Sequence, residues 1–216
     1  MNNPWFDWQY ISRNAEELLS AMRQHVALTF WAVLVGLAIA VPLALVARRH
    51  PRLQVVILGA AGVIYTIPSL ALLAALVPFT GLTALTVEIA LVGYTLLILI
   101  RNILTGLAGV PDDVLEAARG MGYGPARLLW QVELPLALPA ILAGVRVATV
   151  STIALVTVGA LVGFGGLGGL ILTGLNNNLY RAQILTASVL CVLLAIAADL
   201  LLVAASRRLT RWERTT

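Results

Sequence analysis

Long apolar stretches constrain this chain more than any other feature of its sequence. Hydrophobic residues make up 60% of the chain and charged residues only 11%, and most of the charges lie between the apolar stretches. A run of about 20 apolar residues crosses the hydrocarbon core of a bilayer as an α-helix. The pattern therefore predicts an all-α polytopic membrane protein with five transmembrane helices, at about residues 25–47, 53–77, 86–107, 139–163 and 182–205.

Residues 1–24 precede the first predicted span and mix aromatic, apolar and charged side chains. The helical spacing of Ile11, Leu18 and Met22, with tryptophans near the start, is typical of an amphipathic helix that lies in the membrane interface. A helix packed on the rim of the bundle would show the same pattern. We expect no secretory signal peptide, because no basic stretch is followed by an apolar core and a cleavage site.

The positive charges are all arginine and gather at the ends of the predicted spans. One cluster lies at residues 48–52, between the first two spans, and residues 206–216 form a basic tail. Arginines beside spans mark the cytoplasmic side of a membrane protein, so they do not indicate nucleic-acid binding. With five spans, this rule places the amino terminus outside, and the tail and the loop after the third span in the cytoplasm.

That loop, residues 111–139, is polar, charged and helix-prone while its surroundings are apolar. Asp112 and Asp113 follow a proline and predict the start of a helix near residue 113. Glycines and Pro125 end this helix, and a second short helix is expected at 125–133. Small residues at the turn would let another protein's backbone come close, which favours a docking element over a plain solvated loop.

The loop contains the pattern E-A-A-x-G, closed by L-P, at Glu116, Ala117, Ala118, Gly120, Leu134 and Pro135. This pattern resembles the EAA loop of bacterial ABC-importer permeases. Four stretches extend the likeness to permease subunits of osmoprotectant importers of the glycine betaine, carnitine and choline class: residues 65–72, Arg101 with Asn102, residues 116–146 and residues 163–169. The most specific part is E-A-A-R-G-M-G with V-E-L-P-L-A-L-P.

The resemblance implies the MetI-like type I importer fold, with residues 25–205 as the permease domain and residues 111–139 as a cytoplasmic coupling loop. It implies import of a solute such as glycine betaine, carnitine, choline or proline betaine across a bacterial inner membrane. The partners would be a dimer of cytoplasmic ABC ATPases, a second permease subunit and a separate extracytoplasmic binding protein. ATP would be bound and hydrolysed by the ATPase, so this chain is expected to be no enzyme and to bind no cofactor. The same resemblance assigns the coupling contacts to Glu116, Ala117, Ala118, Arg119, Gly120, Met121 and Gly122.

Seven further residues are candidates for the solute path or its gate: Tyr65, Pro68, Ser69, Arg101, Asn102, Thr149 and Thr152. Pro68 predicts a kink in the second span. This kink either lines the solute path or has only a structural role. The arginine and asparagine near the end of the third span suit either a cytoplasmic gate or interface anchoring. The two threonines lie near one face of the fourth span, where hydroxyls line a path or bond to their own backbone.

Signatures of nucleotide binding and of catalysis are absent from the sequence. There is no G-x-x-x-x-G-K-[ST] loop, and the two histidines, His25 and His50, both flank the first span. The single cysteine, Cys191, can form no disulfide framework or cysteine metal site. The sequence therefore indicates transport without bond-breaking chemistry or a bound metal.

Three other functions fit parts of the pattern. An importer of an amino acid such as methionine uses the same five spans and EAA loop. An ion-coupled secondary transporter or channel would need ionisable residues at mid-span. The ionisable residues of the spans are instead expected toward span ends: Glu88, Arg101, Arg146 and Asp199. A membrane scaffold that transports nothing is the third alternative.

Overall fold

Helices make up all the regular structure of residues 3–210, the part of the chain that the computed structural model describes. A bent pair, α3 (Pro51–Thr66) and α4 (Ser69–Thr80), is long and apolar enough to cross a membrane when its two helices are taken together. The four other stretches that are long and apolar enough to cross a membrane are α2 (Ala15–Arg49), α5 (Ala84–Ala108), Pro125–Val162 and α10 (Arg181–Leu209). The predicted all-α fold is confirmed, with four apolar spans, or five when the bent pair counts as one.

The first span starts earlier than predicted. α1 (Trp8–Arg13) is a short helix capped by Asp7, whose Oδ1 accepts a 2.9 Å hydrogen bond from Gln9 N. After Asn14 the chain forms α2 without a break at the expected boundary between residues 24 and 25. No proline or glycine interrupts residues 15–35, so nothing in the sequence stops the helix there.

The last span is also longer than predicted. α10 continues to Leu209, so the predicted basic tail at 206–216 begins as part of the span's own helix. Residues 211–216 of that tail lie outside the described part of the chain.

The connection predicted at residues 164–181 contains an unexpected helix, α9 (Leu167–Asn176). It begins after Gly166, whose φ of +53° is one that glycine adopts readily. Two leucines of α9 share a buried cluster with Leu18 of α2 and Ala187 of α10. This packing outweighs the low helix propensity of the neighbouring glycines.

The stretch after the polar loop is one continuous helical run, not a short helix followed by a separate span. It consists of α7 (Pro125–Leu128), the π turn η1 (Leu129–Glu133), α8 (Leu134–Val156) and the 3-10 turn η2 (Thr157–Val162). In the π turn the Leu134 N–H donates to the carbonyl of Leu129, five residues earlier. The wider turn accommodates Pro135, which has no N–H to donate and crowds the carbonyl four residues before it. The predicted boundary at Pro139 does not exist, because Pro139 lies inside α8.

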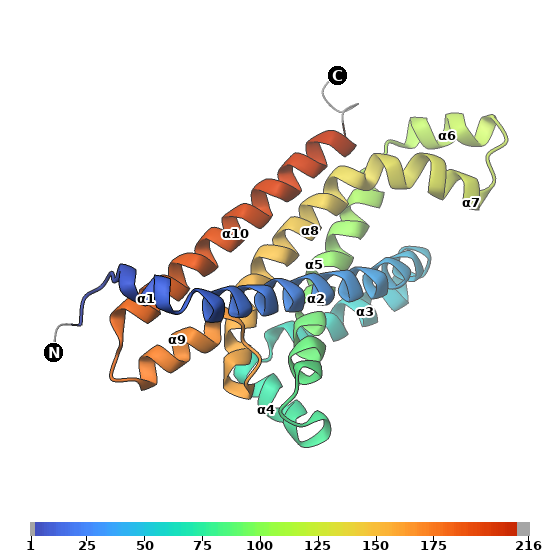
Figure 1. Ribbon diagram of the computed structural model, residues 1–216. Helices are drawn as coiled ribbons and strands as arrows, with labels where there is room; N and C mark the ends of the chain where they lie inside the picture. The colour runs from blue at the N-terminus through green and yellow to red at the C-terminus, as the bar shows by residue number, and fades with distance from the viewer. Residues whose placement is uncertain (1–2, 211–216) are drawn as a thin grey trace.

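α5 lies at the centre of the fold, packed between α2 and α8 (Figure 1). Two glycines let these helices approach closely. A Cβ at Gly36 of α2 would lie 2.1 Å from Thr95 Oγ1, and a Cβ at Gly144 of α8 would lie 2.4 Å from Asn102 Cβ. Lipid is as apolar as leucine, so close van der Waals contact rather than hydrophobicity holds such helices together.

We expect Gly144→Ala to destabilise the fold, because its Cβ would overlap with Asn102 where α8 crosses α5. Overpacking of this kind costs about 1–3 kcal/mol. Gly59→Ala is the matched control, since a Cβ at Gly59 meets nothing within 4 Å and alanine is the better helix former. Thermal unfolding in detergent should show a lower midpoint only for the first variant, and equal midpoints would contradict the close crossing.

Candidate coupling surface and solute path

The polar loop folds into a helical hairpin made of α6 (Asp112–Gly120) and α7. α6 begins after Pro111 with two aspartates in its first turn, where negative charge stabilises a helix. It ends in a Schellman motif, in which Tyr123 N donates to Ala118 O at 3.1 Å and Gly122 N donates to Arg119 O at 2.9 Å. Gly122 adopts a φ of +82°, so a glycine sets the turn that leads into α7.

Six of the seven predicted coupling residues are exposed on this hairpin: Glu116, Ala117, Arg119, Gly120, Met121 and Gly122. Ala118 differs, because it is only 2% exposed and packs with Leu115 and Leu128 in a small core between α6 and α7. A direct contact with a partner therefore does not fit Ala118. Its small side chain instead lets the two helices of the hairpin meet.

An ion pair joins the base of the hairpin to the end of the first span. The carboxylate of Glu133 in η1 is buried and accepts two hydrogen bonds from the guanidinium of Arg48 in α2, one of them 2.8 Å long from Nη2. Beside this pair lies a hollow of about 390 Å³ lined by Arg48, Arg49, Arg119 and Tyr123, among others. Three arginines around one carboxylate leave this corner positively charged, so it suits an acidic surface.

The hairpin projects beyond the ends of α5 and α8, at the opposite end of the bundle from α4 and α9 (Figure 1). The arginine cluster between α2 and α3 lies at the same end, since Arg48 and Arg49 line the hollow beside the hairpin. The basic segment and the polar loop therefore share one side of the membrane domain, as the charge pattern predicted.

A second hollow, of about 460 Å³, opens at the break between α3 and α4. The chain turns there by 98°, with Ile67 extended before Pro68. The Tyr94 hydroxyl of α5 donates a 2.5 Å hydrogen bond to the Ile67 carbonyl, which lies outside both helices. Four of the predicted path residues line this hollow: Tyr65, Pro68, Ser69 and Thr152. The predicted kink is thus a sharp break that meets the hydroxyl-bearing face of α8.

The other three predicted path residues lie elsewhere. Thr149 Oγ1 donates to its own backbone, at the carbonyl of Val145, and lines an apolar groove between α2, α8 and α10. Thr149 and Thr152 therefore face different hollows and form no single stripe. Asn102 packs against Gly144 where α5 meets α8, and the neighbouring Arg101 is exposed.

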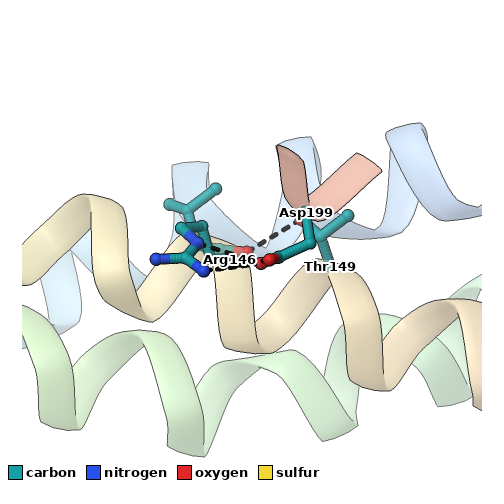
Figure 2. Close-up of polar contacts among 4 residues, drawn as sticks. Arg146, Thr149 and Asp199 are labelled. Atoms are coloured by element: carbon teal, nitrogen blue, oxygen red, sulfur yellow. Dashed lines mark hydrogen bonds and ion pairs between the residues drawn. The ribbon is translucent and has the colours of Figure 1, made fainter. Parts of the chain in front are cut away.

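A second ion pair, which the sequence did not reveal, lies inside the membrane domain (Figure 2). Arg146 of α8 donates from Nε and Nη2 to the two carboxylate oxygens of Asp199 in α10, at 3.0 Å each. Arg146 lies near the midpoint of the helix α8, but it is two residues from Gly144, which packs against Asn102 toward the hairpin end of α5. An unpaired arginine costs about 2.5–3.5 kcal/mol at the centre of a span and less toward its ends. The bidentate pair neutralises this charge and holds α10 onto α8.

Groups that could hold a metal ion, with three or more histidine, cysteine, aspartate or glutamate residues, are not found within residues 3–210. Cys191 is a free, partly buried thiol. His25 is fully buried, its Nε2 lies 2.9 Å from the carbonyl of Ile153, and its backbone packs against Gly166. These contacts fit a structural role for His25 at the junction of α2, α8 and the loop before α9.

Four apolar spans, or five with the bent pair, that carry a charged helical hairpin on one side define a polytopic membrane protein. The family model described as "Binding-protein-dependent transport system inner membrane component" matches residues 32–212. The chain belongs to this family.

Several relatives are similar over nearly the whole chain. The choline transport system permease protein OpuBB of Bacillus subtilis (strain 168) is 39% identical, with 94% of this chain and 93% of the relative covered. The carnitine transport permease protein OpuCB of Listeria monocytogenes is 37% identical, with 93% and 92% covered. The osmoprotectant import permease protein OsmW of Salmonella typhimurium is 39% identical, with 89% and 92% covered.

Solved structures share the fold at low sequence identity. An inward-facing structure of the MetNI methionine ABC transporter matches with a TM-score of 0.77 and 21% identity, over 87% of this chain and 93% of the matched chain. An amino acid ABC transporter with histidines gives a TM-score of 0.78 and 20% identity, over 94% and 98%. The predicted MetI-like permease fold is confirmed.

Removing one partner of the Arg146–Asp199 pair should destabilise the membrane domain more than removing both. Asp199→Asn leaves the arginine without a counter-charge inside the membrane domain, with an expected loss of at most about 3 kcal/mol. The double variant Arg146→Met with Asp199→Leu carries apolar side chains and should recover most of this loss. Thermal midpoints of Asp199→Asn, Arg146→Met, Asp199→Leu and the double variant in lipid nanodiscs measure the coupling. Losses of Arg146→Met and Asp199→Leu that add up in the double variant would show that no direct pair exists.

Proposed function

We propose that this chain is the permease subunit of an ATP-driven importer of an osmoprotectant such as glycine betaine, carnitine, choline or proline betaine. The observation that carries the proposal is the similarity to the choline, carnitine and osmoprotectant permeases, at 37–39% identity over 89–94% of the chain. The methionine and amino acid transporters share the fold at only 20–21% identity. Their substrates are therefore the weaker candidates.

The ATPase is proposed to bind at the α6–α7 hairpin. Ala117 and Gly120 are exposed there with little or no side chain, and a Cβ at Gly120 would meet nothing within 4 Å. A partner's backbone can approach such a surface closely. The nearby arginines would attract acidic groups on the partner. ATP would be bound and hydrolysed by an ATPase dimer, so this chain itself would be no enzyme and would bind no cofactor.

Two further partners complete the proposed transporter, namely a second permease subunit and a separate extracytoplasmic binding protein. By the positive-inside rule, the arginine cluster at 48–52 and the hairpin are proposed to lie in the cytoplasm and the amino terminus outside. The binding protein would then meet the end of the bundle that carries α1, α4 and α9, where residues 3–210 hold far fewer arginines.

Coupling is proposed to run from the hairpin to the hollow at the α3–α4 break. α7, η1 and α8 are continuous, so a displacement of the hairpin moves the wall of the hollow to which Thr152 belongs. The Arg48–Glu133 pair would carry α2 along with this motion. ATP binding and hydrolysis would bias inward-open and outward-open states, because the ATPase holds the hairpin differently in each.

Gly120→Trp should leave membrane insertion intact and abolish ATPase association, because an indole would separate the two surfaces. Gly59→Trp is the matched control, since Gly59 is also exposed and open but lies in α3. Co-purification of the tagged permease with its ATPase measures the effect. Normal recovery of ATPase with Gly120→Trp would refute the proposed docking site.

The substrate is tested by uptake into proteoliposomes that hold the permease, its ATPase and its loaded binding protein. We expect ATP-dependent uptake of labelled glycine betaine, choline or carnitine and none of labelled methionine. Uptake of methionine alone would favour the amino-acid alternative. Uptake driven by an ion gradient without the ATPase would indicate a secondary transporter. A membrane scaffold would be indicated if the complex imports none of these solutes and the loaded binding protein does not stimulate the ATPase.

A further inference from the structure

Two aromatic rings meet at the hollow beside the α3–α4 break. Tyr65 of α3 and Tyr94 of α5 stand edge to face, with ring centroids 6.2 Å apart and planes at 72°. Tyr94 is only 5% exposed and is held by its hydrogen bond to the Ile67 carbonyl, whereas Tyr65 is 44% exposed. The Tyr94 ring is therefore held in one position, and the Tyr65 ring has an exposed face beside the hollow.

The hollow is mostly apolar, carries several hydroxyl groups and has no charged side chain. Its other lining residues carry hydroxyl or aliphatic side chains, and its lining contains no Asp, Glu, Lys, Arg or His. A small metal cation would lose its hydration shell there without gaining a carboxylate ligand. A quaternary ammonium group has no hydrogen-bond donor to satisfy and binds to aromatic faces. The lining therefore favours this kind of cation.

The end of α3 adds negative potential to the same place. The last carbonyls of a helix lack helical partners and carry the negative end of its dipole. The Val63 carbonyl accepts a hydrogen bond from Thr66 Oγ1, and the Ile64 carbonyl accepts one from Ile67 N. The carbonyls of Tyr65 and Thr66 come next, at the carboxyl end of the helix. The two rings and this helix end thus attract a cation jointly.

The hollow also lies near the middle of the membrane domain, between its two ends. Tyr94 is about 15 Å along α5, and the whole helix is about 37 Å long at 1.5 Å per residue. The hollow is therefore near the middle of the membrane domain, between the two ends of the bundle.

We propose that the Tyr65–Tyr94 hollow is a transient binding site for the quaternary ammonium group of the transported solute. The Tyr65 face contacts the methyl groups, and Tyr94 fixes the break that shapes the hollow. This inference rests on the proposed function and deepens it, because it gives the permease a solute preference of its own in addition to that of the binding protein.

The test uses the complete transporter in proteoliposomes, with labelled glycine betaine, choline and carnitine as solutes at saturating loaded binding protein. Tyr65→Leu removes the ring and should lower the uptake rate on the order of tenfold, since a cation–π contact on a half-exposed ring lies between the weak exposed case and the strong desolvated one. Tyr65→Phe keeps the ring and should stay near the wild-type rate. Phe79→Leu is the control for loss of an aromatic side chain, because Phe79 is 86% exposed in α4 and lies outside the hollow.

A second series separates the ring's charge from its shape. Phenylalanines with one, two and three ring fluorines at position 65 weaken the negative ring face while hardly changing its size. We expect uptake to fall stepwise along this series, while stimulation of the ATPase by loaded binding protein stays unchanged and shows that the complex is assembled. Equal uptake across the series, with wild-type import intact, would overturn the binding site and leave the proposed function standing. Failure of the wild-type transporter to import any of the three solutes would overturn both.

Discussion

The rest of the structure depends on the close contact of α5 with α2 and α8. A bilayer gives two apolar helices no hydrophobic reason to associate, so they must gain energy from tight van der Waals packing. Gly36 and Gly144 supply the space on the outer helices, and Gly106 supplies it on α5, where a Cβ would lie 2.9 Å from the carbonyl oxygen of Ala137. Because α5 is held from both sides, the residues that it carries, Tyr94 among them, are fixed in position.

Two polar features inside the membrane domain, the break at Pro68 and the charge of Arg146, are stabilised by partners from other helices. The break at Pro68 exposes a carbonyl that Tyr94 of α5 satisfies, and Arg146 of α8 is neutralised by Asp199 of α10. An unsatisfied polar group in lipid costs several kcal/mol. The break at Pro68 and the two charges are therefore stable only when the helices are packed together. Their partners show which helices must be in contact, namely α3 and α4 with α5, and α8 with α10.

Hydropathy and local signals predicted much of this architecture. The apolar runs located the four long spans and the bent pair. The proline, aspartates and glycines of the loop predicted a helix that begins at Asp112, next to the expected position. The kink at Pro68 was foreseen as well, although its angle was not, because the partner that stabilises the break comes from α5.

Features that depend on distant packing could not be predicted. α9 forms because its leucines are buried against α2 and α10, whereas its glycines on their own indicate a loop. The continuity of α8 with the hairpin depends on a π turn, which leaves no clear composition signal. The burial of Ala118 and the pairing of Arg146 with Asp199 require knowing which faces meet. The seven predicted path residues accordingly separate into four at one hollow and three elsewhere.

The unbroken stretch Pro125–Val162 contains 38 residues, which corresponds to about 57 Å of helix. Gly144, where this rod crosses α5, is near its midpoint, so the crossing divides it into two arms of about 28 Å each. A rotation of about 10° about such a fulcrum displaces both tips by roughly 5 Å in opposite directions. If the ATPase moves the hairpin as proposed, a push at one end of this helical run therefore becomes an opposite displacement at its other end.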